Sequence, residues 1–304
     1  MTAPDSSAAG RHLPGIDHPL ILVRDIDAAR GFYARLGFTV TPVGRHPWGT
    51  STSLAVLSRS ALELMSIYDE HLIDGYAAGD FRFGRHMRDA LAEREGISLV
   101  ALHSQDAAGD RAIMEARGAV FQGGIEFRRK VRPPGGKWDE AVVSLQVSCD
   151  PALPRVSHFL AQQHKPQLLW VPEWMQHANG ATHVAAVHYR AREPEPVLHR
   201  LASLFGRDRI TTAPGGWQVA TGQGVFGVIR AGEEDAVIGA GPLPRMGRDE
   251  AAAIAIDVAV SDLPAAGRLL ATAGIAASEM GGSLAIDDVA SCGNVLLRFV
   301  PGAR

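Results

Sequence analysis

Two polar residues stand inside apolar, strand-like segments of the chain. His18 lies in the run IDHPLILV, and Glu63 lies in the run ALELMSIYD. A buried carboxylate is costly unless a cation or a hydrogen-bond donor compensates it. Imidazole and carboxylate groups are also ligands that Zn²⁺, Fe²⁺, Mn²⁺ or Ni²⁺ accept. We therefore take His18 and Glu63 as candidate metal ligands, and Glu63 as the candidate catalytic group for proton transfer.

Strand parity predicts that these two side chains share one concave face. Successive side chains in a strand alternate between faces, so His18 should lie on the face of Leu20, and Glu63 on the face of Met65. A plainer interpretation stays open. His18 could be a neutral imidazole bonded to Glu63, or both groups could face water in an open cleft.

A repeated pattern indicates the elements that position this pair. Four times the chain shows an apolar run, an acidic residue, a helical stretch and, twelve or thirteen residues after the acid, a glycine. The four pairs are Asp25 and Gly37, Asp106 and Gly118, Glu193 and Gly206, and Asp262 and Gly274. The acid would cap the helix N-terminus, and the glycine would supply its left-handed stop. Strand-like segments follow, so each unit is predicted to be a βαβββ module.

The modules should pair, because one helix on a four-stranded sheet leaves the other face bare. We predict an α+β fold of four βαβββ modules in two domains, a size that suits 304 residues. Residues 1–14 would be a flexible tail, residues 15–178 the first domain with the working cleft, and residues 179–304 the second.

The second domain lacks the polar pair at the equivalent places. The position seven residues before the capping acid is His18 in the first module, but Leu99, Ala186 and Ala255 in the other three. We expect the C-terminal half to pack against the first domain, to shape its cleft or to mediate association.

The four modules with their capping acids resemble the vicinal oxygen chelate superfamily, which includes glyoxalase I, the extradiol dioxygenases and the bleomycin-resistance proteins. The resemblance covers nearly the whole chain and is strongest in IDHPLILVRDIDAARGFYARLGFTV and ALELMSIYD. The pieces GRHPWGT and HANGA resemble a glyoxalase-like subgroup. The resemblance implies a curled cleft in which the first and last strands of paired modules hold a divalent metal ion. It places that role on His18 and Glu63.

The second module must complete such a site, and its last strand is predicted in SHFLAQQHK. Placing Phe159 against the helix aims His158 and Gln162 into the cleft. Gln162 is the preferred third metal ligand, because glutamine replaces glutamate in some relatives. A parity shift of one residue would select Gln163 instead. His103 and His158 are candidate substrate contacts, although each could simply be a polar lining residue.

The loop GRHPWGT is predicted at the cleft mouth, where Trp48 would stack on a planar substrate and Arg45 would hold an anionic group. The alternative is that this loop only shapes a turn. The basic excursion RRKVRPPGGK is predicted to be an exposed hairpin or lid, and the segment LLWVPEWMQH a lid or linker.

The resemblance implies a metal-dependent glyoxalase-like enzyme with lyase or isomerase chemistry on a small molecule with adjacent oxygens. One alternative is a metal-free small-molecule binding or sequestering protein of the bleomycin-resistance type. The other is an Fe(II) extradiol dioxygenase, which the empty ligand positions of the second domain disfavour.

Composition limits the partners and the compartment. A net charge of −3 disfavours nucleic acid and anionic membranes as partners. No apolar run reaches the roughly 20 residues of a membrane span, and the N-terminus lacks a signal-peptide pattern. Cys149 and Cys292 are expected to be free thiols. We therefore expect a cytoplasmic protein with a small-molecule substrate, and sheet pairing in the superfamily allows a homodimer.

Overall fold

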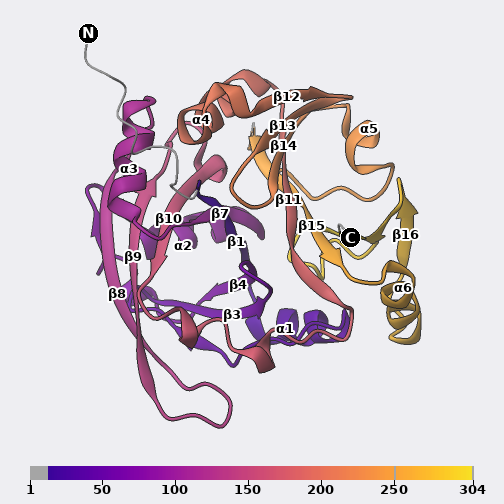
Figure 1. Ribbon diagram of the computed structural model, residues 1–304, viewed down its shortest axis with the longest axis horizontal. Coiled ribbons are helices and arrows are strands. Elements are labelled where there is room, and N and C mark those ends of the chain that lie inside the picture. The colour runs from indigo at the N-terminus through magenta and orange to yellow at the C-terminus, as the bar shows by residue number, and fades with distance from the viewer. Residues whose placement is uncertain (1–12, 250, 303–304) are drawn as a thin grey trace, which may run out of the picture.

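The computed structural model describes residues 13–249 and 251–302. Apart from Leu13 and Pro14, the predicted flexible tail lies outside these residues. The fold is α+β and is built on two eight-stranded sheets (Figure 1). No helix in the described ranges is long and apolar enough to cross a membrane. Cys149 and Cys292 are free, as predicted.

The first sheet has the strand order β2-β3-β4-β1-β7-β10-β9-β8. Its strands are β1 (Gly15–Leu22), β2 (Gly44–Arg45), β3 (Thr50–Val56), β4 (Ala61–Ile67), β7 (Gly96–His103), β8 (Gly123–Val131), β9 (Asp139–Ser148) and β10 (Ser157–Gln163). The helices of this half are α1 (Ile26–Arg35), α2 (Phe83–Glu93) and α3 (Ala107–Ala116).

The second sheet repeats this arrangement in the order β12-β13-β14-β11-β15-β18-β17-β16. Its strands are β11 (Ala181–Ala191), β12 (Ile210–Ala213), β13 (Gly216–Ala220), β14 (Val225–Arg230), β15 (Ala251–Val260), β16 (Ala277–Met280), β17 (Ser283–Ile286) and β18 (Leu296–Pro301). Its helices are α4 (Pro194–Phe205), α5 (Glu234–Ile238) and α6 (Leu263–Thr272).

The four predicted βαβββ modules are confirmed. Each begins with one strand, continues through α1, α3, α4 or α6, and ends with three strands. The two modules of each sheet join through their first strands, because β1 pairs antiparallel with β7 and β11 pairs antiparallel with β15. The last strand of each module then lies parallel to the first strand of the same module.

Three of the four predicted helix caps form as expected. The Asp25 carboxylate accepts hydrogen bonds from the backbone N–H groups of Asp27 and Ala28, and Asp106 and Asp262 cap α3 and α6 in the same way. Glu193 occupies the cap position of α4 but makes no such bond. Its side chain is one methylene longer than aspartate, and glutamate is not among the residues favoured at this position.

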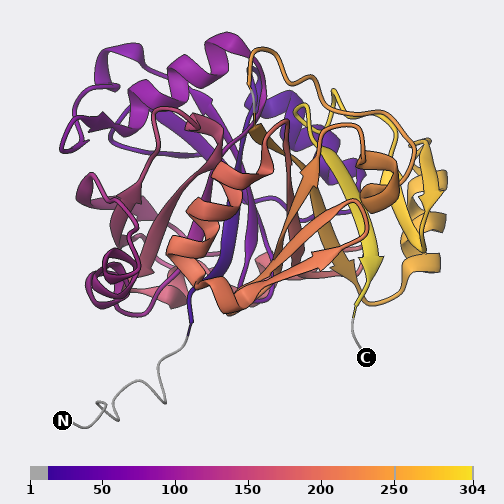
Figure 2. The same ribbon diagram turned by 90° about the horizontal axis from the view of Figure 1, so that it is seen from above.

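The helix-covered faces of the two sheets share one apolar core. Ile21 of β1, Val187 of β11 and Ile256 of β15 all belong to it. Tyr33 of α1 donates a hydrogen bond across the core to the carbonyl of Cys292, at 3.1 Å. Figure 2 shows the two halves side by side along this boundary. The opposite face of each sheet is therefore the one available for a cleft.

Two connections are only partly regular. Residues 38–42, between α1 and β2, are irregular, and β2 has only two residues. Residues 70–95 join the first two modules, and only the second part of this segment forms a helix, α2. Its first part contains a 3₁₀ turn (Glu70–Leu72) and a small hairpin, β5 (Ala77–Ala78) with β6 (Phe81–Arg82). The basic excursion after Arg128 is the predicted hairpin, between β8 and β9.

Candidate functional site

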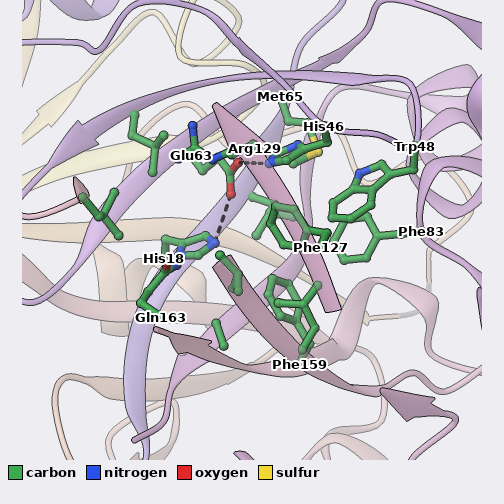
Figure 3. Close-up of a pocket in the computed structure, with 16 residues that line it drawn as sticks. His18, His46, Trp48, Glu63, Met65, Phe83, Phe127, Arg129, Phe159 and Gln163 are labelled. Carbon is green, nitrogen blue, oxygen red and sulfur yellow. Dashed lines mark ion pairs between the residues drawn. The ribbon is translucent and has the colours of Figure 1, made fainter. Parts of the chain in front are cut away.

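The first sheet curls until its two edge strands approach each other. A Cβ atom placed on Gly44 of β2 would lie 3.2 Å from Arg129 Nη1 of β8, although these strands stand at opposite ends of the sheet order. The curl encloses a chamber of about 50 Å³, enough for a few water molecules. Polar and aromatic side chains from both modules line it (Figure 3), among them His18, His46, Trp48, Glu63, Phe83, Phe127, Arg129, Phe159 and Gln163.

His18 and Glu63 meet inside this chamber, as the strand parity predicted. His18 Nε2 lies 3.0 Å from Glu63 Oε2, and both side chains are buried. The second carboxylate oxygen accepts a hydrogen bond from Thr52 Oγ1 at 2.5 Å. Burial would raise the pKa of Glu63, but the hydrogen bond and the charge of His18 outweigh it and lower the pKa to about 2. Glu63 is therefore an ionised carboxylate held at both oxygens.

Asp17 is a member of the site that the sequence analysis missed. The pairing of β1 with β7 shifts register between Ile16 and His18, so Asp17 is the extra residue of a β-bulge. The bulge brings the fully buried Asp17 carboxylate to His18, whose Nδ1 lies 2.6 Å from Oδ1. The signal was present in the sequence. Strict alternation would have placed an acid in the apolar core, and a bulge avoids that cost.

The two carboxylates hold His18 in its charged form. Burial would lower the pKa of His18, but Asp17 and Glu63 raise it to about 10. Burial likewise opposes ionisation of Asp17, yet the charge and hydrogen bonds of the two histidines lower its pKa to about 2. His103 Nδ1 lies 3.3 Å from the other Asp17 oxygen, which raises the pKa of His103. The predicted substrate contact His103 thus lies behind His18 and next to Asp17.

The GRHPWGT loop folds into the chamber rather than lying at its mouth. Trp48 is only 1% exposed and stacks on His46, with their ring centroids 4.8 Å apart. His46 Nε2 lies 4.0 Å from Glu63 Oε1. Burial lowers the pKa of His46 to about 4, so its imidazole is neutral. Arg45 lies outside the chamber, where its guanidinium covers the Tyr68 ring at 4.7 Å.

The predicted facing of β10 is wrong by one residue. Phe159 and Ala161 point into the chamber, and Gln163 lines it. Gln162 points the other way, accepting from the Ala107 backbone N–H at 3.1 Å and donating to the Gln105 carbonyl at 2.8 Å, so it supports the start of α3. Both faces of β10 are buried near its centre, so alternation of polar and apolar residues could not identify its facing.

His158 follows the same corrected parity and lies between the two sheets. It is fully buried, and its Nε2 atom lies 3.1 Å from the Tyr189 hydroxyl. Burial lowers its pKa well below the ordinary value, so the imidazole is neutral. His158 therefore belongs to the shared core, not to the chamber where the sequence analysis had placed it.

The first sheet and its chamber lie within a segment that matches a known protein family. The family described as glyoxalase-like domain matches residues 16–205, which is more than half of the chain. The chain belongs to this family. Its structural neighbours lie in the vicinal oxygen chelate superfamily, as the module pattern suggested. No curated protein matches the sequence.

Solved structures that resemble this glyoxalase-like protein share its fold at low sequence identity. A hypothetical protein from Staphylococcus aureus has a TM-score of 0.63 and 10% identity, covering 94% of this chain and 99% of its own. A mutant of 4-hydroxymandelate synthase from Streptomyces coelicolor has a TM-score of 0.56 and 12% identity, covering 97% and 94%. The Mn(II)-bound glyoxalase from Novosphingobium aromaticivorans has a TM-score of 0.50 and 12% identity, covering 95% and 82%.

The imidazole and carboxylate donors that line the chamber of this glyoxalase-like chain come from its first module. On β7, Ala101 stands opposite His18, and on β10 the chamber-lining residues are Phe159, Ala161 and Gln163, of which only Gln163 has a donor atom, its amide oxygen. Among residues 13–249 and 251–302, no group of three or more His, Cys, Asp or Glu side chains is arranged to hold a metal ion. His18 and Glu63 are thus a pair of donors that solvent or substrate oxygens would have to complete.

Proposed function

We propose that this protein is a glyoxalase-like enzyme that moves a proton on a small molecule with adjacent oxygens. In this proposal His18 and Glu63 hold a divalent metal ion, and Glu63 accepts the proton. The observation that carries it is the 3.0 Å contact between His18 and Glu63 inside an aromatic-lined chamber. The family match supports this chemistry, and the Mn(II)-bound glyoxalase is a structural relative that holds such an ion.

The two donors fit a divalent ion. Their imidazole nitrogen and carboxylate oxygen are donor types that a divalent ion accepts, and both atoms face the same chamber, 3.0 Å apart. Asp17 supplies the carboxylate that commonly orients a metal-binding histidine through its other ring nitrogen. An ion bound here would displace the proton of His18 and act as a Lewis acid on the substrate oxygens.

The protein's own groups account for the proton transfer. Glu63 is ionised and fixed by Thr52, so one carboxylate oxygen is held in place to accept a proton from a carbon next to a carbonyl. Asp17 holds the orientation of the His18 ring. Trp48, Phe127 and Phe159 exclude bulk water, which strengthens every electrostatic interaction in the chamber.

Solvent-deuterium exchange tests this proposal without knowledge of the product. α-Hydroxy ketones would be incubated in D₂O with protein purified without chelators, and exchange at the hydroxyl-bearing carbon next to the carbonyl followed by NMR. We expect exchange with the wild type and its loss in Glu63→Gln and His18→Ala, while the exposed control His199→Ala remains active. Elemental analysis should find an ion in the wild type and less in both site variants. Equal exchange in Glu63→Gln and the wild type would refute the assignment.

A second candidate is a metal-free protein that sequesters a small molecule. It is favoured by the second module, which contributes no imidazole or carboxylate to the chamber and places Ala101, Phe159 and Ala161 on this face of the sheet. In this case no preparation would contain a stoichiometric ion, no compound would exchange, and an aromatic ligand would bind tightly. The same NMR and elemental measurements therefore separate the two functions.

A further inference from the structure

A larger cavity lies directly outside the catalytic chamber. It has a volume of about 470 Å³ and shares Leu54, Arg129 and Leu169 with the chamber, so the two spaces adjoin. Its outer walls come from the hairpin between β8 and β9, from the start of β2, and from Trp174. A molecule bound there would be able to reach His18 and Glu63 with one end.

The walls of this outer cavity are cationic and aromatic. Its charged lining residues are Arg45, Arg129, Lys130 and Arg132, and no acidic residue is among the described residues that line it. Within the described chain none of these four forms an ion pair with a carboxylate. Trp138, which is 66% exposed, and Trp174 add flat apolar surfaces beside these charges.

Arg129 is the cation that joins the two spaces. It is partly buried, and burial lowers its pKa while the charge of Glu63 opposes that effect. The Glu63 oxygens contact His18 and Thr52, and Glu63 forms no ion pair with Arg129. The guanidinium makes no hydrogen bond with any described residue. A partly buried arginine that faces a cavity and has no carboxylate partner among the described residues is available to an anion from a ligand.

The neighbouring residue on β8 provides an internal comparison. Arg128 points to the opposite, solvent-facing side of the strand and pairs with Glu140 at 3.2 Å and with Glu126 at 3.6 Å. Two adjacent arginines thus differ in one respect that matters for binding: Arg128 has acidic partners in the protein, and Arg129 faces a cavity without them.

We propose that the outer cavity is an anion subsite and that the substrate is an acid whose carboxylate or phosphate binds Arg129. Arginine suits both groups, because its planar fork can donate two parallel hydrogen bonds. The apolar body of the substrate lies against Trp138 and Trp174, and its reacting oxygens enter the chamber. This assignment of the substrate class rests on the proposed function, since it takes the chamber as the reaction site.

Isothermal titration calorimetry with three matched probes tests the subsite. Benzoate and phenyl phosphate carry the two candidate anions, and benzamide has the same ring without charge. We expect each anion to bind the wild type at least about tenfold more tightly than benzamide. One charge-assisted hydrogen bond typically contributes this much affinity. The tighter of the two anions identifies the headgroup. Benzamide binding as tightly as both anions would overturn the proposal.

Variants on one strand localise the effect. Arg129→Met should weaken binding of the preferred anion at least about tenfold and leave benzamide unchanged, and Arg129→Lys should retain part of the affinity. Arg128→Met is the matched control and should bind like the wild type. Equal losses in Arg128→Met and Arg129→Met would show a general charge effect and overturn the subsite.

Failure of the subsite and failure of the proposed function give different results. Glu63→Gln should lose deuterium exchange and keep anion binding. If the wild type binds anions through Arg129 but exchanges no compound, the subsite stands and the proposed function falls. If exchange is unchanged in Arg129→Met for acidic and uncharged compounds alike, the function stands and the subsite falls.

Discussion

The concave faces of the two sheets both contain buried charges, but they use them differently. On the second face, Asp257 of β15 accepts from Arg298 Nε and Nη2, each at 2.7 Å, and from His188 Nε2 at 3.0 Å. Arg298 also donates to the carbonyl of Ile238 at 3.0 Å. These groups satisfy one another. On the first face, the charged groups surround a chamber, and Arg129 has no carboxylate partner among the described residues.

Buried charge alone therefore does not identify a functional site. Burial would raise the pKa of Asp257, but His188 and Arg298 lower it, just as His18 lowers that of Glu63. The two sites differ in two respects. A chamber lies beside Glu63, and Arg129, which also lines that chamber, has no carboxylate partner among the described residues, whereas Arg298 is paired with Asp257. A closed network stabilises the sheet, whereas charges next to a cavity are available to a ligand.

The largest expected difference is in catalysis. Glu63→Gln should reduce the rate of deuterium exchange by about 10²- to 10⁴-fold, the usual contribution of a positioned general base. Asp257→Asn, the corresponding change on the second face, should leave that rate nearly unchanged under conditions where the variant is folded. NMR exchange rates of both variants, with folding checked by circular dichroism, make the measurement. A similar loss in both variants would show that the faces act together.

The next-largest effect is on the free energy of unfolding, and here the change on the second face should cause the loss. Asp257→Ala leaves Arg298 buried without its partner and should lower the free energy of unfolding by about 3–5 kcal/mol. Adding Arg298→Met removes the unpaired charge and should recover much of the loss. Urea denaturation measures both. Full stability in Asp257→Ala would mean that the network is not structural.

A smaller effect concerns the pH dependence of stability, through His158 in the core between the two sheets. The pKa of His158 is well below 6.5 in the folded protein, so below about pH 6.5 the unfolded chain binds a proton that the folded chain does not. Stability should therefore fall on acidification, with a His158 contribution of up to about 1.4 kcal/mol per pH unit.

The measurement is urea denaturation of the wild type and His158→Gln at pH 7.5 and 5.5. The variant should lose less stability between the two pH values, while the exposed control His199→Gln should follow the wild type. Parallel losses in the wild type and His158→Gln would contradict the burial of a neutral imidazole.

The smallest difference between the halves lies at their first helices. Asp25 caps α1 with two hydrogen bonds, whereas Glu193 makes none at α4. Asp25→Ala should lower the free energy of unfolding by about 1 kcal/mol, and Glu193→Ala should change it by only a few tenths. Thermal unfolding of both variants at neutral pH measures these two losses. Equal losses would mean that Glu193 stabilises α4 in another way, such as through the helix dipole.

Much of the fold followed from local sequence pattern. Asp25, Asp106 and Asp262 form the predicted caps, and the four modules have the predicted βαβββ order. Alternation along two strands also placed His18 and Glu63 on one face, and the structure brings them to 3.0 Å. These features depend on neighbours within a few residues in the chain or on strict alternation, so a single sequence contains enough information to predict them.

The rest depends on contacts between segments that are distant in the chain, and these contacts form only in the folded protein. A bulge against β7 turns Asp17 toward His18, and burial on both faces of β10 hid the facing of Gln162 and Gln163. Arg129 reaches Gly44 only because the sheet curls until its opposite edges meet. Local pattern was enough to predict the modules and the His18–Glu63 pair. Sheet curvature and register decided which other side chains surround that pair, because both arise from packing across the whole domain.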